Sequence, residues 1–318
     1  ADDNVTHELW VSADAGPITR IEAFLDSLRN VNGTRPVRSV SPRAKSAPHR
    51  RKVFLPPMTD HAHVLAAAFR ACGVESEVLP GSDGETIRIG KQNCSGRECY
   101  PLALTTGDMI KATRRPDFDP ARSAFFMPSG KGPCRFGQYN RYHRMVLDNL
   151  GLHDVMIVAP MQDESVYRDL GMVGKDFFRL LWKGVVSVDM LQKIHWEHRP
   201  YEKKKGAADR IYGQALADAA GAIERREDPL HVLKRAYEEF TAMEISERNK
   251  PVIGIVGEIY IRANRFGNED VVGQIERLGG EAWVAPIGEW FLYVNETTKV
   301  AARMNRSWRD LAKAHLTN

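Results

Sequence analysis

Four cysteines carry the most specific chemistry in this chain: Cys72, Cys94, Cys99 and Cys134. Cys94 and Cys99 have C-x4-C spacing, and Gly96 lets the loop between them turn back. Cys99 and Cys134 each directly precede a predicted helix, where free N–H groups and partial positive charge stabilise a thiolate. Three thiolates on two loops predict an iron–sulfur or zinc site, and free thiols in loops are the alternative. Cys72 lies on an apolar helix face, so we expect it in the core.

The loop that leads into Cys134 is rich in small residues and follows a predicted strand. In open parallel sheets, ligands bind at the carboxyl ends of the strands, so this loop belongs at the expected crevice. Small residues let the backbone approach a bulky or anionic group, and the arginine after Cys134 would balance the charge of a cluster. We therefore predict four cofactor-binding residues in this loop: Ser129, Gly130, Gly132 and Arg135.

The elements that must position these cysteines alternate between strands and helices. Residues 52–57 and 74–80 have the pattern of buried strands, and a helix with an N-cap and a closing glycine is predicted over 59–73. A strand–helix–strand unit of this length implies parallel strands with a right-handed connection. Residues 85–90 are expected to be extended. The further predicted elements are a helix at 100–113, a strand at 123–128, a helix at 134–151 and a strand at 154–160.

The second half of the chain contains a helical segment and a shorter α/β pattern. Amphipathic runs predict helices between residues 163 and 247. The elements predicted after them are a strand at 250–261, a helix at 268–280, a strand at 281–286 and a helix at 288–306. We predict an α/β fold with a Rossmann-like parallel sheet lobe, a helical middle segment and a second α/β lobe that is expected to be incomplete. The boundaries are 1–50 for an N-terminal helix and basic linker, 51–165 for the first lobe, 166–248 for the helical segment and 249–318 for the second lobe.

The composition is that of an ordinary globular protein, with 43% hydrophobic and 27% charged residues. No stretch has the apolar length of a membrane span, and the N-terminus lacks the features of a signal peptide. We therefore expect a cytoplasmic, reducing location without a disulfide framework. The net charge of +4 is concentrated in residues 33–52, which hold seven Arg or Lys and no acid. This segment has no aromatic residue and no helical period, so it is interpreted as a linker and not as a nucleic-acid site.

Two further pairs of polar residues have structural interpretations that we favour over functional ones. Asp163 and Glu164 follow a predicted strand, and Asp is a good N-cap for the next helix, so capping is preferred to proton transfer. His61 and His63 flank the start of a helix, but residues two apart do not share a helix face. Surface histidines are therefore preferred to a metal pair.

The second half of the chain contains two more candidates. His195 and His198 have the spacing of a metal pair on a helix, but no third ligand is nearby in the sequence, and a proline two residues later predicts a helix end. Glu258, Arg262 and Asn264 lie just beyond the strand predicted in the second lobe. They are expected to face the crevice, and Arg262 or Arg265 to meet a phosphate, with ordinary surface pairing as the alternative.

Five sequence motifs together resemble one known superfamily: SGRECYPLALTTGD, FFMPSGKGPCRFGQYN, APMQDES, RPYE and GEIYIRANRFGNEDVVGQIERLGGEAWVAPIGEW. They are colinear over about residues 50–295 and are similar to the 2-hydroxyacyl-CoA dehydratase and benzoyl-CoA reductase superfamily. The similarity is greatest to the branch related to acyl-CoA dehydratase activases, which includes the double-cubane-cluster proteins. Members of this superfamily have Rossmann-like lobes, with an iron–sulfur cluster bound between the lobes by cysteines.

The resemblance implies that Cys99 and Cys134 are cluster ligands, and Cys94 is a third candidate that aligns less closely. It implies a [4Fe-4S] or double-cubane cluster that receives low-potential electrons from an ATP-hydrolysing activase protein or domain. The substrate would be an acyl-CoA or another small unsaturated molecule, and a homodimer or larger complex is expected. A later cysteine of the family pattern has no counterpart here. No G-x-x-x-x-G-K-[ST] motif is present, so ATP binding by this chain is not predicted.

Three functions are therefore considered from the sequence. The first is an iron–sulfur component of an ATP-dependent low-potential reductase or dehydratase. The second is a non-catalytic scaffold or interaction domain of a larger activase-related protein, which the short second lobe and the basic linker favour. The third is a zinc-binding or thiol-redox protein that uses the same cysteines.

Overall fold

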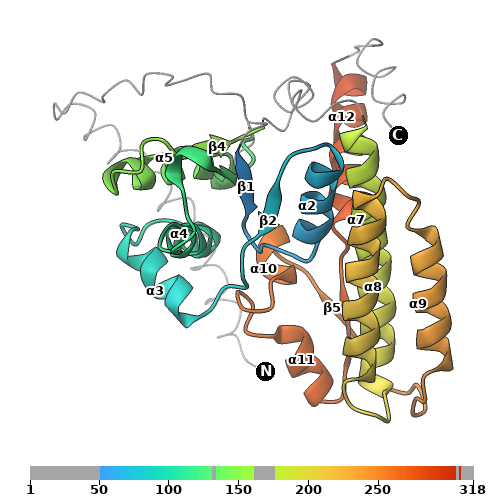
Figure 1. The fold of residues 1–318 in the computed structure, drawn as a ribbon. Coiled ribbons are helices and arrows are strands. Elements are labelled where there is room, and N and C mark those ends of the chain that lie inside the picture. The colour runs from blue at the N-terminus through green and yellow to red at the C-terminus, as the bar shows by residue number, and fades with distance from the viewer. Residues whose placement is uncertain (1–50, 131–133, 161–175, 306–307, 309–318) are drawn as a thin grey trace. The chain divides into compact units, whose positions relative to one another are not determined.

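The computed structural model describes residues 51–130, 134–160, 176–305 and 308 (Figure 1). The predictions for residues 1–50, Gly132, Asp163 and Glu164 lie outside the described residues. Among the described helices, none combines the length and apolar composition needed to cross a bilayer.

A four-stranded parallel sheet forms the first lobe, with the strand order β2-β1-β3-β4. Its strands are β1 (Lys52–Leu55), β2 (Ser76–Val78), β3 (Ser123–Phe126) and β4 (Met156–Val158). β1 pairs in parallel with β2 and β3, and β3 pairs in parallel with β4. The predicted α/β fold with a parallel sheet is confirmed. Short apolar runs form these strands because helices bury both faces of a parallel sheet.

Helices cover both faces of this sheet (Figure 1). They are α2 (His61–Ala71) on one face, and α3 (Gly84–Gln92), α4 (Tyr100–Thr113) and α5 (Tyr139–Asn149) on the other. Successive residues of β1 enter different cores: Val53 packs with Phe69 of α2, and Phe54 packs with Ile89 of α3. The alternation follows from the two-residue period of a strand. This alternation determines which helices pack beside the ends of β1 and β3.

The extended segment predicted at residues 85–90 is wrong, because these residues belong to helix α3. A capping box starts the helix: Asp83 Oδ1 accepts from the Thr86 N–H at 2.8 Å, and Thr86 Oγ1 accepts from the Asp83 N–H at 3.2 Å. Glycines then allow α3 to lie directly against α4. A Cβ on Gly90 would stand 1.9 Å from the Ala103 carbonyl oxygen. Capping and close packing outweigh the weak extended pattern of Thr86, Ile87 and Ile89.

The predicted helical segment contains α7 (Phe177–His198), α8 (Ala207–Glu224) and α9 (Leu230–Ala242). α7 ends at His198 and continues as the short 3-10 helix η5 (Arg199–Tyr201), as expected from the proline at position 200. Phe177 and Leu180 of α7 join the core between α2 and the sheet. α7 therefore attaches the helical segment to the first lobe.

Two sequence interpretations on the α2 side need comment. His61 is buried, and its Nε2 lies 3.0 Å from Asp189 Oδ1 of α7, so the prediction of a surface histidine is wrong there. Asp189 also accepts the N–H groups of Ile287 and Gly288, which explains why a polar pair is buried between α2 and α7. His63 is exposed, as predicted. Cys72 is half-buried and packs against the core of α2.

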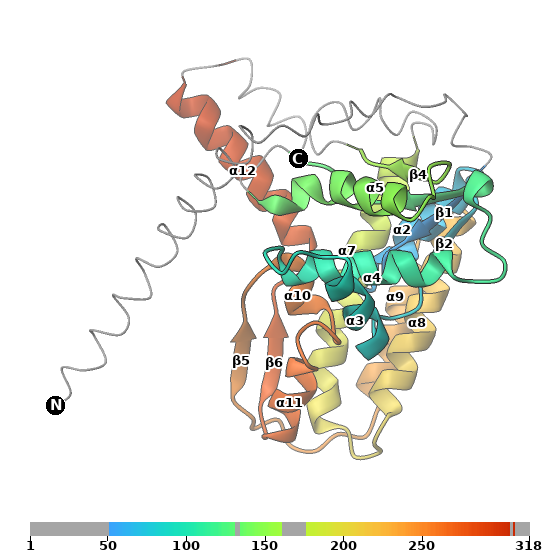
Figure 2. The same ribbon diagram turned by 90° about the vertical axis from the view of Figure 1, so that its left-hand side faces the viewer.

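The second lobe has a separate pair of parallel strands, β5 (Val252–Ile255) and β6 (Glu281–Val284) (Figure 2). Its helices are α10 (Ile259–Ala263), α11 (Val271–Arg277) and α12 (Gly288–Met304). The strand predicted over 250–261 is too long, because the chain turns at Gly257 with a φ of 144° and Glu258 caps α10. Asn264 donates to the Pro57 and Met58 carbonyls after β1. This contact holds α10 at the carboxyl edge of the first sheet.

Candidate functional site

Cys99 is the N-cap of α4, with φ −71° and ψ 150° and no side-chain capping bond. Pro101 occupies the first turn of this helix, where the missing N–H is tolerated. The Cys99 carbonyl accepts from the Leu102 N–H at 3.0 Å, so the backbone caps the helix while the thiol is free to interact elsewhere. The thiol lies 2.6 Å from the hydroxyl of Tyr139 on α5. The predicted place of this cysteine, immediately before a helix, is confirmed.

Cys134 is the N-cap of η3 (Arg135–Gln138), a short 3-10 helix that leads directly into α5, so the helix predicted at 134–151 begins as a tighter turn. Its side chain is exposed. The pKa of Tyr139 lies well above its ordinary value, and burial is the largest cause. The hydrogen bond to Cys99 and the charges of Cys99, Glu258 and Cys134 raise the pKa further. The Tyr139 phenol therefore lies within electrostatic range of two predicted ligands and of an acid from the second lobe.

Glu98 folds the loop between Cys94 and Cys99. Its carboxylate accepts from the Ser95 hydroxyl at 2.9 Å and from the backbone N–H groups of Gly96 at 3.0 Å and Arg97 at 3.2 Å. Burial alone would raise the pKa of Glu98, but these hydrogen bonds outweigh it and lower the pKa to about 2. Gly96 has a φ of 89°, which confirms that the loop turns back at this glycine.

Cys94, the other cysteine of the loop, lies near Tyr142 and Thr106. It is half-buried, and burial raises the pKa of its thiol, an effect that the nearby Tyr142 hydroxyl only partly offsets. Thr106 Oγ1 of α4 also lies near this thiol, without a hydrogen bond of ordinary geometry. A buried, protonated thiol is a weaker nucleophile and a weaker metal ligand than the thiolate. Cys94 and Cys99 are both half-buried, and each lies beside a different tyrosine of α5.

The small residues before Cys134 hold its turn in place. Ser129 is buried, and its Oγ donates to the Gly137 carbonyl at 3.0 Å. A Cβ on Gly137 would meet the Gly130 carbonyl oxygen at 2.3 Å, so the backbones touch there. Arg135 Nη1 donates to the Arg97 carbonyl at 2.8 Å, which joins the two cysteine loops. Ser129, Gly130 and Arg135 therefore position the loops, and their contact with a cofactor stays a prediction.

Four buried polar atoms of the described residues have no hydrogen-bond partner, and one of them, Thr106 Oγ1, lies near Cys94. The four atoms are Thr106 Oγ1, Asn140 Oδ1, Tyr260 OH and Arg262 Nε. They lie on α4, α5 and α10. Buried polar groups normally have partners, so the free Thr106 hydroxyl beside Cys94 is available to a further polar group there.

The donor set suits an iron–sulfur cluster in its chemistry. Thiolates are the usual cluster ligands, and backbone N–H groups at a helix start are the usual donors to cluster sulfur. Within residues 51–130, 134–160 and 176–305, no three His, Cys, Asp or Glu side chains are close enough to share one metal ion. A cubane places its cysteines on separate iron atoms, so this finding leaves the predicted cluster untested.

Sequence reasoning missed three residues of this site: Glu98, Tyr139 and Tyr142. The two tyrosines contact residues about forty positions away in the sequence: Tyr139 lies beside Cys99, and Tyr142 lies beside Glu98. A usable signal was present, since Tyr139 and Tyr142 are three residues apart on a predicted helix and share one face. That Glu258 faces the crevice stays a prediction; its charge contributes to the raised pKa of Tyr139.

Comparison of the chain with models of protein families, with curated proteins and with solved structures finds no match. The resemblance to the dehydratase and reductase superfamily therefore stays a prediction from the sequence motifs.

Proposed function

We propose that this chain is the iron–sulfur cluster-binding component of an ATP-dependent low-potential reductase or dehydratase. It would receive electrons from an activase ATPase and act on an acyl-CoA or another small unsaturated substrate. One observation supports this most strongly. Cys99 and Cys134, from different loops at the carboxyl edge of a parallel sheet, both begin helices, and a hydrogen bond from Arg135 to the Arg97 carbonyl joins their loops.

In this proposal Cys99 and Cys134 hold the cluster as thiolates, with Cys94 as a candidate third ligand. The cluster, when bound, supplies one-electron transfer at low potential. The chain's own residues supply position and charge. Arg135 follows Cys134 in the chain, and its guanidinium ties the two loops together through the Arg97 carbonyl. Glu258 Oε2 accepts the N–H groups of Tyr260 and Ile261, so its carboxylate is held in a fixed orientation on the second-lobe side.

The test is anaerobic purification of the chain, followed by iron and sulfide quantification and an EPR spectrum. We expect a brown protein that contains both elements, and loss of most of the iron in Cys99→Ser and in Cys134→Ser. Cys72→Ser is the matched control, because Cys72 packs against the core of α2 and should not affect iron content. Colourless protein after anaerobic reconstitution would refute the proposal. Full iron content in Cys134→Ser would remove that residue from the ligand set.

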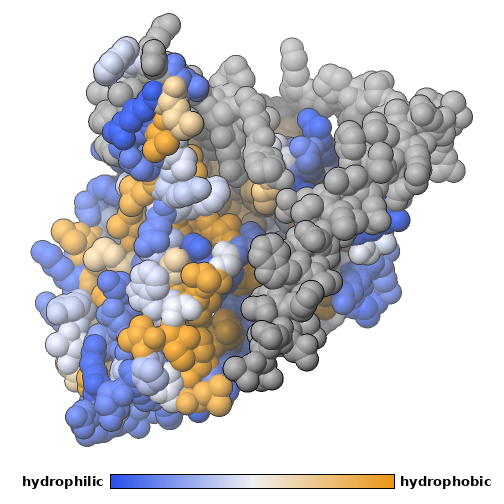
Figure 3. All heavy atoms as spheres, turned by 180° about the vertical axis from the view of Figure 1, so that it is seen from behind, coloured by the Kyte–Doolittle hydropathy of each residue, from blue (hydrophilic) through white to orange (hydrophobic). Residues whose placement is uncertain are grey.

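A second candidate function, an interaction domain of a larger assembly, is favoured by the surface of β5. Val252 is 63% exposed and Ile253 is 42% exposed, although strands of parallel sheets are normally buried on both faces. Figure 3 looks onto this side of the molecule, where apolar side chains gather. β5 pairs with β6 alone among the described strands. An α/β partner that adds a parallel strand to β5 would bury this surface.

Hydrogen exchange measured with and without an activase domain separates the two functions. A scaffold should bind the domain without iron and should show protection at residues 252–255. Ile253→Asp should then abolish binding, whereas a substitution on exposed α9, such as Tyr237→Asp, should not. Binding that needs iron and leaves β5 unprotected would contradict the scaffold function.

A further inference from the structure

Helix α5 brings two tyrosines to the two cysteines of the C-x4-C loop. Tyr139 and Tyr142 lie three residues apart and therefore on one face of the helix. The Tyr139 hydroxyl is 2.6 Å from Cys99 Sγ. The Tyr142 hydroxyl lies near Cys94, within range of its charge. Each thiol of the loop thus has one phenol beside it.

The two phenols differ in what their single proton can do. The Tyr142 hydroxyl lies 3.0 Å from the Asn93 carbonyl oxygen and 3.1 Å from Glu98 Oε1. Both of these groups only accept hydrogen bonds, so they take the proton of Tyr142. Among the described residues, Tyr139 has one hydrogen-bond partner, the sulfur of Cys99. Its proton is available to that sulfur whenever Cys99 is a thiolate.

The ring of Tyr139 is held so that its hydroxyl cannot turn away. The side chain is 3% exposed and packs with Leu102 and Met127. Phe136 meets it edge-on, with ring centroids 5.1 Å apart. These contacts involve the ring and not the hydroxyl, so a phenylalanine at position 139 would fill the same space. The hydroxyl can therefore be removed without opening a cavity.

We propose that Tyr139 is a positioning residue that donates its O–H to the Cys99 sulfur and raises the reduction potential of the cluster bound there. This inference rests on the proposed function. Reduction adds negative charge to the cluster, and part of that charge lies on the ligand sulfur. A donor to the sulfur stabilises the reduced form more than the oxidised form. Removing the donor therefore makes the cluster harder to reduce.

The experiment compares wild type, Tyr139→Phe and Tyr142→Phe after anaerobic cluster assembly in the full chain. The midpoint potential is measured by EPR-monitored titration. Tyr139→Phe should lower it by a shift equal to about a tenfold change in the ratio of reduced to oxidised protein, which is 59 mV for one electron. Tyr142→Phe removes the same group three residues away, but its proton is already taken, so its shift should be less than a third of this.

A second readout follows the proton itself. Pulsed EPR in H2O and D2O should show an exchangeable proton coupled to the cluster of wild type and Tyr142→Phe, and no such proton in Tyr139→Phe. If all three proteins assemble clusters with equal potentials and equal proton couplings, the inference about Tyr139 is wrong while the proposed function stands. If wild type assembles no cluster, the proposed function fails and this inference falls with it. Loss of the cluster in Tyr139→Phe alone would overturn a tuning role in favour of assembly.

Discussion

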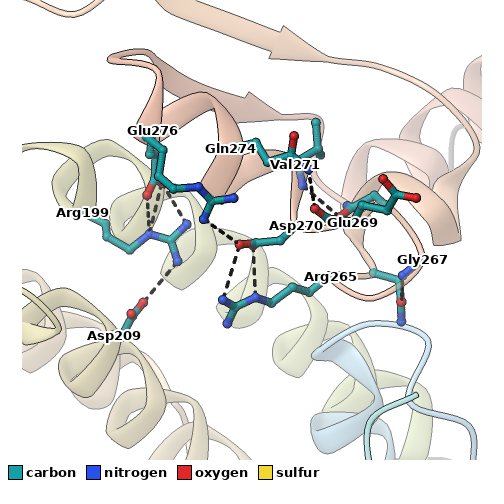
Figure 4. Close-up of polar contacts among 12 residues, drawn as sticks. Arg199, Asp209, Arg265, Gly267, Glu269, Asp270, Val271, Gln274 and Glu276 are labelled. Atoms are coloured by element: carbon teal, nitrogen blue, oxygen red, sulfur yellow. Dashed lines mark hydrogen bonds and ion pairs between the residues drawn. The ribbon is translucent and has the colours of Figure 1, made fainter. Parts of the chain in front are cut away.

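The ion pair between Arg199 and Glu276 joins the helical segment to the second lobe, and its removal should loosen that junction (Figure 4). Arg199 Nε donates to Glu276 Oε2 at 2.8 Å and Nη2 donates to Oε1 at 2.9 Å, in the two-pronged geometry of a strong pair. The side chains are 16% and 13% exposed. Arg199 Nη1 also donates to Asp209 Oδ1 at 3.1 Å.

The perturbation is Glu276→Gln, which removes the charge but keeps the shape and one oxygen acceptor. Deleting one partner of a fully buried pair costs about 3–5 kcal/mol. The loss here should be smaller, because both side chains retain some exposure and Asp209 still balances Arg199. A hydrogen bond to a charged group contributes roughly 1.5–3 kcal/mol. We therefore expect a decrease of about 2 kcal/mol in the free energy of unfolding.

The assay is urea unfolding followed by circular dichroism, run as a double-mutant cycle with Arg199→Gln. A coupling energy of about 1–2 kcal/mol is expected for groups in direct contact. Arg265 provides the control, since it pairs with Asp270 at 3.0 Å in the same region but is 81% exposed (Figure 4). Arg265→Gln should cost less than about 0.5 kcal/mol. Equal losses for the two pairs, or no coupling in the cycle, would refute the reasoning from burial.

Two further predictions concern packing and pH. A Cβ on Gly137 would stand 2.3 Å from the Gly130 oxygen, so Gly137→Ala should destabilise by about 1–3 kcal/mol and lower iron retention at Cys134. A Cβ at Gly213 on α8 would meet open space, so Gly213→Ala should instead stabilise the protein by about 0.5–1 kcal/mol. Thermal unfolding checks both glycine variants. Equal effects on stability would contradict the close contact between Gly137 and Gly130. Burial raises the pKa of Asp108 to about 6, whereas the unfolded value is about 4. The folded state then binds more protons between these values, so its stability should fall by about 2 kcal/mol as pH rises from about 4 to 6. Asp108→Asn should remove this slope in urea unfolding at several pH values, and an unchanged slope would exclude Asp108 as its source.

The sequence predicted the elements that depend on local pattern. Short apolar runs between prolines and glycines predicted β1, β3 and β4, because a strand buried on both faces needs no polar alternation. Pro101 and the small-residue loop before Cys134 predicted two cysteines at helix starts, and both are N-caps. These features are set within a few residues, so they can be read without knowledge of the fold.

The errors of the sequence predictions fall where distant segments compete with local pattern. Residues 85–90 were predicted to be extended, but their glycine packs against the backbone of α4 and the segment is helical. His61 was predicted at the surface, but Asp189 meets it from α7. In both cases the deciding contact forms only when helices pack against each other. Local sequence pattern therefore does not show it.

Local sequence by itself determined that this chain forms parallel α/β units and that Cys99 and Cys134 stand at helix starts. Only the tertiary structure decided which groups surround those thiols. The packing of α5 against α4 puts Tyr139 on Cys99, and the loop folded by Glu98 leaves Cys94 half-buried beside a different phenol. The physical reason is that a hydrogen bond depends on position in space, and helices from different parts of the chain set those positions.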